Sequence, residues 1–147
     1  MDFIWTEQLS VGNAILDSDH KELLRLVRDI DCITKARDHS ALSRALKLLK
    51  GCMDRHFLNE ELLAHAIGIP FAMHKMAHQN MQAELDLTRH QIGNDSVVAI
   101  YVMEHYAQFL LNWLIEHITG EDTLMKPALQ NRPYDFTIDG VHFTAGC

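Results

Sequence analysis

Histidines and carboxylates that recur about one helical turn apart are the feature that most constrains the fold of this sequence. Three pairs are spaced by four or five residues, and a single histidine nearer the N-terminus completes the set. Residues at positions i and i+4 of an α-helix share one face and lie about 6 Å apart along its axis, so each pair can share a cation. The candidate metal ligands are His20, His56, Glu60, His74, His78, His117 and Asp122.

Four long segments carry helical periodicity, and the candidate ligands fall in phase with their apolar stripes. Inward positions of the third segment alternate by three and four residues: Phe71, His74, His78, Met81 and Leu85. Ser18 is the predicted N-cap of the first helix, Gly68 the C-cap of the second, and Pro70 is expected in the first turn of the third. The predicted helices span residues 18–37, 40–68, 70–91 and 96–118. Their short connections favour antiparallel neighbours, which predicts an all-α, up-down-up-down four-helix bundle.

The in-phase placement would bury the ligand side chains inside the bundle. A buried polar group without a partner costs roughly 1–3 kcal/mol, so a core with five imidazoles and two carboxylates needs a cation to satisfy them. Imidazole with carboxylate suits iron, zinc or manganese, and seven ligands are enough for two ions. One histidine alone would more often be an ordinary core or solvated residue, so the prediction rests on the joint pattern.

Bulk properties exclude several other classes of protein. The chain has 147 residues, the size of one domain, which we divide into a bundle at 1–130 and a tail at 131–147. Its net charge of −7 argues against a nucleic-acid partner. The N-terminus does not read as a signal peptide, and no apolar run approaches the ~18 residues of a membrane span, so we expect a cytoplasmic protein. Three cysteines at unrelated spacings argue against a disulfide framework and fit a reducing compartment.

Residues 134–143 differ from the rest of the chain. They alternate apolar and polar side chains around Asp139-Gly140, which is a strong hairpin signal. An isolated hairpin is marginal in water, so we expect it to dock on the bundle, on a partner protein or on a second copy of the chain. A frayed tail is the alternative.

Several stretches together resemble one known family. They are Trp5, Ser10-Val11-Gly12, Asp17-Ser18-Asp19-His20-Lys21-Glu22-Leu23, His56-Phe57-Leu58-Asn59-Glu60-Glu61, Pro70 with His74 and His78, and Trp113-Leu114-Ile115-Glu116-His117-Ile118 with Asp122. Over about residues 5 to 130 the chain resembles the hemerythrin family, specifically its single-domain bacterial members. It departs from the family pattern at Asp19, where glutamine is usual, at Leu63-Ala64, where a methionine is common, and in its C-terminal tail.

The resemblance implies two non-heme iron ions joined by an oxo or hydroxide bridge. His74, His78 and His117 would complete one iron, and His20 and His56 would hold the other. Glu60 and Asp122 would bridge the two irons, and dioxygen would bind at an open position on the second. Residues flanking the ligands by spacing would line the oxygen pocket: Leu23, Phe57, Trp113, Leu114 and Ile118.

We therefore predict reversible dioxygen binding, for storage, transport or delivery, rather than enzymatic turnover. Diiron oxidases of this architecture use carboxylate-rich sites with two Glu-x-x-His repeats, and this sequence contains none. Fewer carboxylates make high-valent iron less accessible and favour reversible two-electron transfer to oxygen. The alternatives are a sensor of oxygen or nitric oxide that acts through a partner protein, and a metal store or zinc-stabilised bundle.

Overall fold

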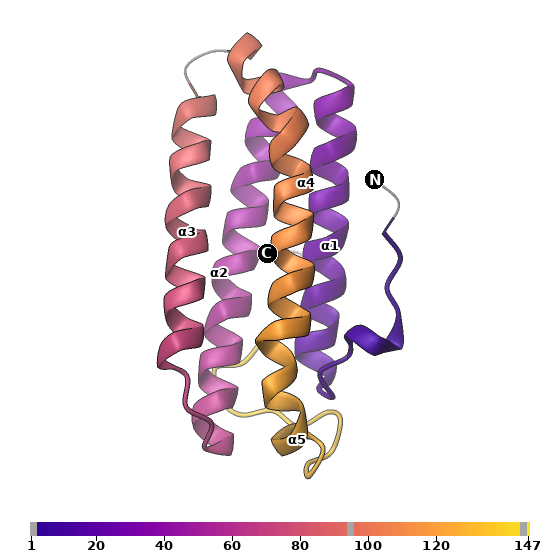
Figure 1. Ribbon diagram of the computed structural model, residues 1–147, viewed down its shortest axis with the longest axis vertical. Coiled ribbons are helices and arrows are strands. Elements are labelled where there is room, and N and C mark those ends of the chain that lie inside the picture. The colour runs from indigo at the N-terminus through magenta and orange to yellow at the C-terminus, as the bar shows by residue number, and fades with distance from the viewer. Residues whose placement is uncertain (1–2, 94–95, 145–146) are drawn as a thin grey trace.

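The computed structural model describes residues 3–93, 96–144 and 147. Its body consists of four long helices: α1 (Ala14–Lys35), α2 (His39–Ile67), α3 (Ala72–Ile92) and α4 (Ser96–Gly120). Three short helical turns accompany them: η1 (Glu7–Leu9), η2 (Asp122–Met125) and α5 (Lys126–Leu129). Figure 1 shows α1 to α4 side by side, each running opposite to its neighbour in sequence. The predicted all-α, up-down-up-down four-helix bundle is confirmed.

The helix ends depart in detail from those predicted. α1 begins four residues before Ser18, because Asn13 is its N-cap and its side chain accepts hydrogen bonds from two backbone amides of the first turn. Asp38 caps α2 in the same way, and Gly68 ends that helix in the left-handed conformation, as predicted. Pro70 lies before α3 rather than in its first turn. The predicted gap between the third and fourth helices, residues 92–95, includes residues 94–95, which lie outside the described residues.

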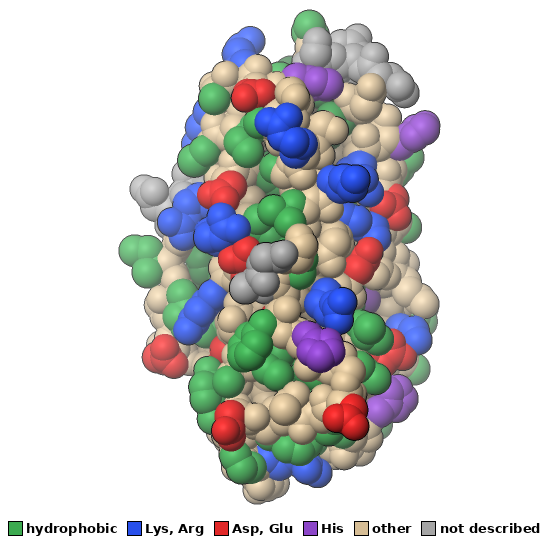
Figure 2. Space-filling view, turned by 180° about the vertical axis from the view of Figure 1, so that it is seen from behind, with side chains coloured by type: hydrophobic (Ala, Val, Ile, Leu, Met, Phe, Trp, Pro, Cys, Tyr) green, Lys and Arg blue, Asp and Glu red, His purple; other side chains and the backbone are tan. Residues whose placement is uncertain are grey.

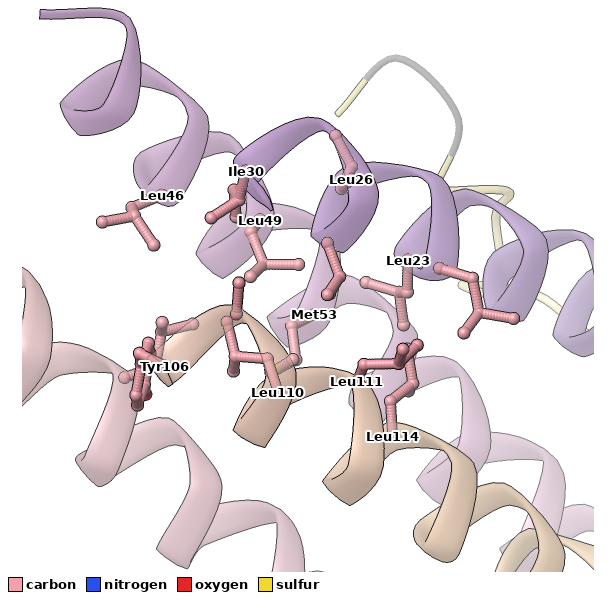
Figure 3. Packing of buried hydrophobic residues seen from close by; sticks show 14 of the residues in the cluster. Leu23, Leu26, Ile30, Leu46, Leu49, Met53, Tyr106, Leu110, Leu111 and Leu114 are labelled. Atoms are coloured by element: carbon pink, nitrogen blue, oxygen red, sulfur yellow. The ribbon is translucent and has the colours of Figure 1, made fainter. Parts of the chain in front are cut away.

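The interior is layered along the bundle axis. A large apolar cluster fills the half away from α5, where Leu23, Met53 and Leu110 from three helices pack together (Figure 3). A smaller cluster, including Leu63 and Met125, fills the opposite end. On α1 and α2 the candidate ligands lie where the sequence passes from one cluster to the other. On α1, for example, Leu16 belongs to the small cluster and Leu23 to the large one, with His20 between them.

The tail forms neither a hairpin nor a frayed end. Its described residues contain no strand, so the predicted hairpin is wrong, although Asp139-Gly140 does make a turn and Gly140 has a φ of 89°. The amide of His142 binds the Asn59 side chain at 3.2 Å, and the amide of Thr144 binds Asp19 at 2.8 Å. Backbone donors that a hairpin would pair with each other are therefore taken by side chains of the bundle.

The tail packs along the bundle, which was one of the docking sites expected for it. Tyr134 donates its hydroxyl to Asp17 at 2.8 Å, and its carbonyl accepts the Ala14 amide at 2.8 Å. Val141 is buried in the smaller apolar cluster. In Figure 1 the tail passes beneath the lower end of the bundle and the chain ends beside the middle of the long helices. The division of the chain at residue 130 stays a prediction.

The surface carries charges of both signs. On the face shown in Figure 2, Lys and Arg side chains are interspersed with Asp and Glu rather than gathered into one basic patch. Within the described ranges, none of the helices combines the length and apolarity needed to cross a membrane.

Candidate metal centre

The structure brings all seven candidate ligands together in one layer of the bundle. Every long helix contributes, and the short turn η2 supplies the last carboxylate. By element they are His20 from α1, His56 and Glu60 from α2, His74 and His78 from α3, His117 from α4 and Asp122 from η2. All are buried except His74, whose side chain is 10% exposed. The i, i+4 spacing on α2 and on α3 places both members of each pair on the inward face, as predicted.

The seven side chains form two overlapping ligand groups. One contains three histidines, His74, His78 and His117, and the other contains two, His20 and His56. Glu60 and Asp122 belong to both groups. Within each group the potential donor atoms lie within 4.8 Å of one another. Donors about 2.0–2.2 Å from a shared metal ion would lie at most about 4.4 Å apart, so each group is close to the size of one coordination shell.

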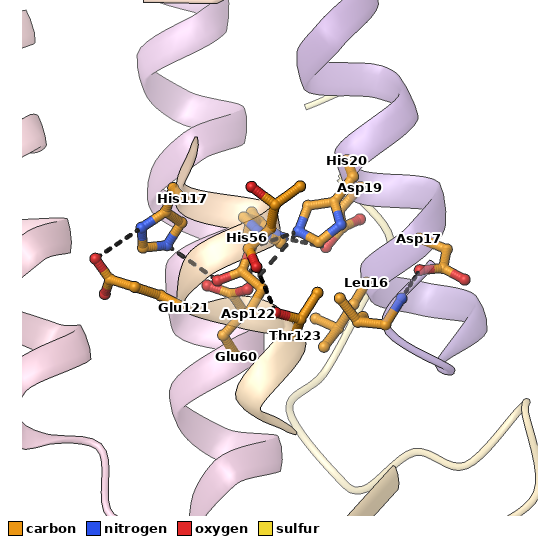
Figure 4. A network of polar contacts seen from close by, with 12 residues as sticks. Leu16, Asp17, Asp19, His20, His56, Glu60, His117, Glu121, Asp122 and Thr123 are labelled. Atoms are coloured by element: carbon orange, nitrogen blue, oxygen red, sulfur yellow. Dashed lines mark hydrogen bonds and ion pairs between the residues drawn. The ribbon is translucent and has the colours of Figure 1, made fainter. Parts of the chain in front are cut away.

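Each of the two carboxylates turns one oxygen toward each group, and Figure 4 shows Asp122 between His20 and His117. Glu60 Oε1 lies 3.3 Å from His56 Nε2, whereas its Oε2 lies 3.0 Å from His78 Nε2. Asp122 Oδ2 lies 3.0 Å from His20 Nε2, whereas its Oδ1 lies 3.0 Å from His117 Nε2. A carboxylate arranged in this way can bridge two cations.

Many of these polar atoms have no hydrogen-bond partner within the described part of the chain. They include both oxygens of Glu60 and of Asp122, and the Nε2 atoms of His20 and His56. On the other side of the site, His78 Nε2 approaches His117 Nε2 to 2.8 Å, and His74 Nε2 approaches the same atom to 3.1 Å. Three imidazole nitrogens aimed at one point, beside buried carboxylate oxygens that make no hydrogen bond in the described residues, fit a cation-binding centre.

The balance of charges inside the centre also fits a cation-binding site. Burial raises the pKa of the Glu60 carboxyl, but His56 and its neighbours hold that pKa well below the usual value. Burial lowers the pKa of His56, yet Glu60 and Asp19 together raise it to about 10. Burial lowers the pKa of His78. Without a metal the site thus keeps its carboxylates ionised and balances them with imidazole protons, which a binding cation would displace.

Asp19 is a candidate positioning residue that sequence reasoning missed. It is fully buried, and its Oδ2 lies 3.2 Å from His56 Nδ1. The side chain of Asn59 donates to the same oxygen at 2.9 Å. A carboxylate at the remote nitrogen of a ligand imidazole orients the ring and increases its basicity. Its position next to His20 was noted in the sequence, but no local signal connects Asp19 with His56, which lies on another helix.

The predicted oxygen-pocket residues divide into two sets. Phe57 stacks on His78, with ring centroids 3.7 Å apart and planes within 6°. Trp113 stacks on His117 at 4.6 Å. Both aromatic rings therefore stack on the three-histidine group, and Phe57 also reaches His56, with ring centroids 5.9 Å apart. The remaining three are buried in the large apolar cluster next to the centre: Leu23, Leu114 and Ile118.

Comparisons with known proteins all indicate the same family. The hemerythrin HHE cation binding domain matches residues 11–129. A bacteriohemerythrin from Pseudomonas aeruginosa (strain LESB58) is 25% identical over 122 residues, which cover 81% of this chain and 76% of that protein. Hemerythrin-like proteins from Naegleria gruberi and Naegleria fowleri are each 30% identical over 129 residues, covering 86% of this chain and 93% of theirs. Since the family match spans well over half of the sequence, this chain belongs to the hemerythrin HHE cation binding domain family.

Proposed function

We propose that this protein binds dioxygen reversibly at a non-heme diiron centre and serves in oxygen storage, transport or delivery. The observation that carries the proposal is the division of Glu60 and Asp122 between two histidine groups, one oxygen toward each. This arrangement supports two bridged ions rather than one. Membership of a family named for cation binding supports a metal centre at these residues.

In this proposal the five histidines are distributed unequally between the two irons. His74, His78 and His117 would hold one iron, His20 and His56 would hold the other, and both carboxylates would be shared between them. The two-histidine group has one protein donor fewer, so its iron is the more open to an outside ligand. The chemistry that two ferrous irons would supply here is two-electron transfer to oxygen, and the protein would supply their positioning.

The surrounding residues position the ligands and keep water out. Asp19 holds the ring of His56 by its Nδ1 atom, so Nε2 faces the bridging carboxylate. Leu114 and Ile118 are at most 1% exposed and give the centre an apolar wall. An apolar wall keeps water and protons away from the centre, which would favour reversible binding over side reactions. We expect no catalytic turnover from this protein.

Anaerobic reconstitution with ferrous iron, followed by metal analysis and cycles of air and argon, tests the proposal. Two irons per chain and a visible absorption that appears in air and disappears under argon are expected. Glu60→Ala should lose iron from both positions, because it removes a shared bridge. Glu61→Ala is the matched control, since that neighbouring carboxylate binds Lys75 at 2.6 Å outside the centre. One metal per chain, or unchanged oxygen binding in Glu60→Ala, would contradict the proposal.

Sensing of oxygen or nitric oxide through a partner is the second candidate, and one observation favours it. The Thr144 amide and His56 Nδ1 both lie on the carboxylate of Asp19, so the tail is connected to the centre through a single side chain. A shift of His56 on ligand binding would thus reach a surface segment. Hydrogen exchange of the Thr144 amide with and without oxygen would test this role, and equal rates would count against it.

A further inference from the structure

Two cysteines far apart in the sequence meet at one carbonyl oxygen. Cys52 lies on α2 and is fully buried, and its thiol donates to the Thr144 carbonyl at 3.5 Å. The thiol of Cys147, which is exposed, donates to the same oxygen. Since both thiols reach a single atom, their sulfurs are neighbours. The third cysteine, Cys32, is exposed on α1 and makes no part of this contact.

The two thiols have different environments. Burial and the neighbouring Cys147 thiol raise the pKa of Cys52 to about 12, so Cys52 is a poor nucleophile toward anything in solvent. Cys147 is open to solvent and can meet an oxidant first. An accessible thiol beside a sheltered one is the arrangement of an attacking and a resolving cysteine.

We propose that Cys52 and Cys147 form a reversible disulfide that locks the C-terminal tail onto the bundle. The oxidant is a small disulfide of the glutathione type. The thiolate of Cys147 attacks one glutathione sulfur, the glutathione S–S bond breaks, and one glutathione thiolate leaves. The Cys52 sulfur then attacks the neighbouring Cys147 sulfur of the mixed disulfide, the mixed S–S bond breaks, and the second glutathione leaves as a thiolate that takes up the proton of the Cys52 thiol. The two protein thiols lose two electrons and two protons, and glutathione disulfide is reduced to two glutathiones.

The lock would act on the segment that reaches the metal centre. Thr144, whose carbonyl receives both thiols, also donates its amide to Asp19 at 2.8 Å. His142 binds Asn59 through both its amide and its carbonyl. A bond from Cys147 to α2 would therefore hold these backbone contacts in place. In a reducing compartment the pair would rest as free thiols, as redox-sensing cysteines do.

The first experiment counts thiols in the full-length protein after equilibration in glutathione redox buffers, by alkylation and mass spectrometry of intact chains and peptides. It does not depend on iron. Cys32→Ser should lose both remaining thiols in oxidising buffer and yield one peptide pair containing Cys52 and Cys147. Cys147→Ser and Cys52→Ser should form no intramolecular disulfide. Disulfides between chains, bonds that include Cys32, or glutathione adducts alone would overturn the proposal.

The second experiment tests the lock with Cys32→Ser, oxidised and reduced. A disulfide that closes a long loop should raise Tm by roughly 5–15 °C. Amide hydrogen exchange at His142 and Thr144 should slow in the oxidised form. The double variant Cys32→Ser/Cys147→Ser should show neither change between the two buffers. A disulfide that forms but leaves both Tm and exchange unchanged would refute the lock.

Discussion

Replacing Asp19 by asparagine tests whether a buried side chain outside the ligand set supports the metal centre. The carboxylate accepts hydrogen bonds from Thr144 and Asn59 and lies 3.2 Å from His56 Nδ1. Asparagine has the same shape but only one acceptor oxygen. Whichever way its amide turns, its NH2 group faces at least one buried donor.

The expected magnitude follows from these contacts. A buried donor left without its acceptor costs roughly 1–3 kcal/mol, so Asp19→Asn should lower the free energy of unfolding of the metal-free protein by about that amount. Weakening the partner of a ligand imidazole typically costs about 10–100-fold in metal affinity, equivalent to roughly 1.4–2.7 kcal/mol. We expect the loss to fall on the iron that His56 is proposed to hold, and the three-histidine position to retain its metal.

The assay is anaerobic transfer of ferrous iron to a chromogenic chelator, with urea unfolding of the metal-free protein alongside. Asp29→Asn on the same helix is the matched control, because that side chain is half exposed and pairs with Arg25 at the surface. Surface pairs of this kind contribute about 0–1 kcal/mol, so neither measurement should change much. If Asp19→Asn released iron as slowly as the control, the positioning role assigned to Asp19 would be refuted.

Three further predictions concern pH, the apolar wall and the tail. Despite burial, Glu60 and Asp19 raise the pKa of His56 from 6.5 to about 10 in the metal-free protein. Protonated His56 therefore contributes its full stabilisation below pH 6.5, and this stabilisation is lost as the pH rises through 10. Urea unfolding should show the fall in the free energy of unfolding with pH, and His56→Gln should flatten it. Leu114→Ala should lower the free energy of unfolding by about 2–5 kcal/mol and speed autoxidation, which is monitored as loss of the oxygenated absorption. Leu124→Ala is the control, because that side chain is 70% exposed, and it should leave both quantities unchanged. Equal autoxidation rates in the two variants would show that Leu114 does not exclude water. Truncation after Arg132 removes the tail contacts and should lower Tm while size-exclusion chromatography shows an unchanged oligomeric state; a lower state would mean that the tail joins two chains.

The sequence by itself determined the bundle and the composition of the candidate centre. Helical geometry is local, so a repeat of three and four residues places Phe71, His78 and Leu85 on one face whatever packs against it. The same reasoning places Glu60 on the same helix face as His56, one turn further along, before any tertiary contact is known. Four such faces joined by short connections leave few arrangements other than an antiparallel bundle, and the structure has that bundle.

Tertiary structure alone decided the partners of the ligands and the path of the tail. Asp19 and His56 are 37 residues apart in the chain, and Asp19 and Thr144 are 125 apart. No periodicity links positions on different helices. The alternation in residues 134–143 indicated a hairpin because a local sequence pattern contains no information about side chains elsewhere in the chain that can accept hydrogen bonds from the tail's amides. Buried carboxylate and amide side chains on α1 and α2 offered the tail's amides hydrogen bonds to the bundle, and those bonds replaced the pairing of one tail segment with the other.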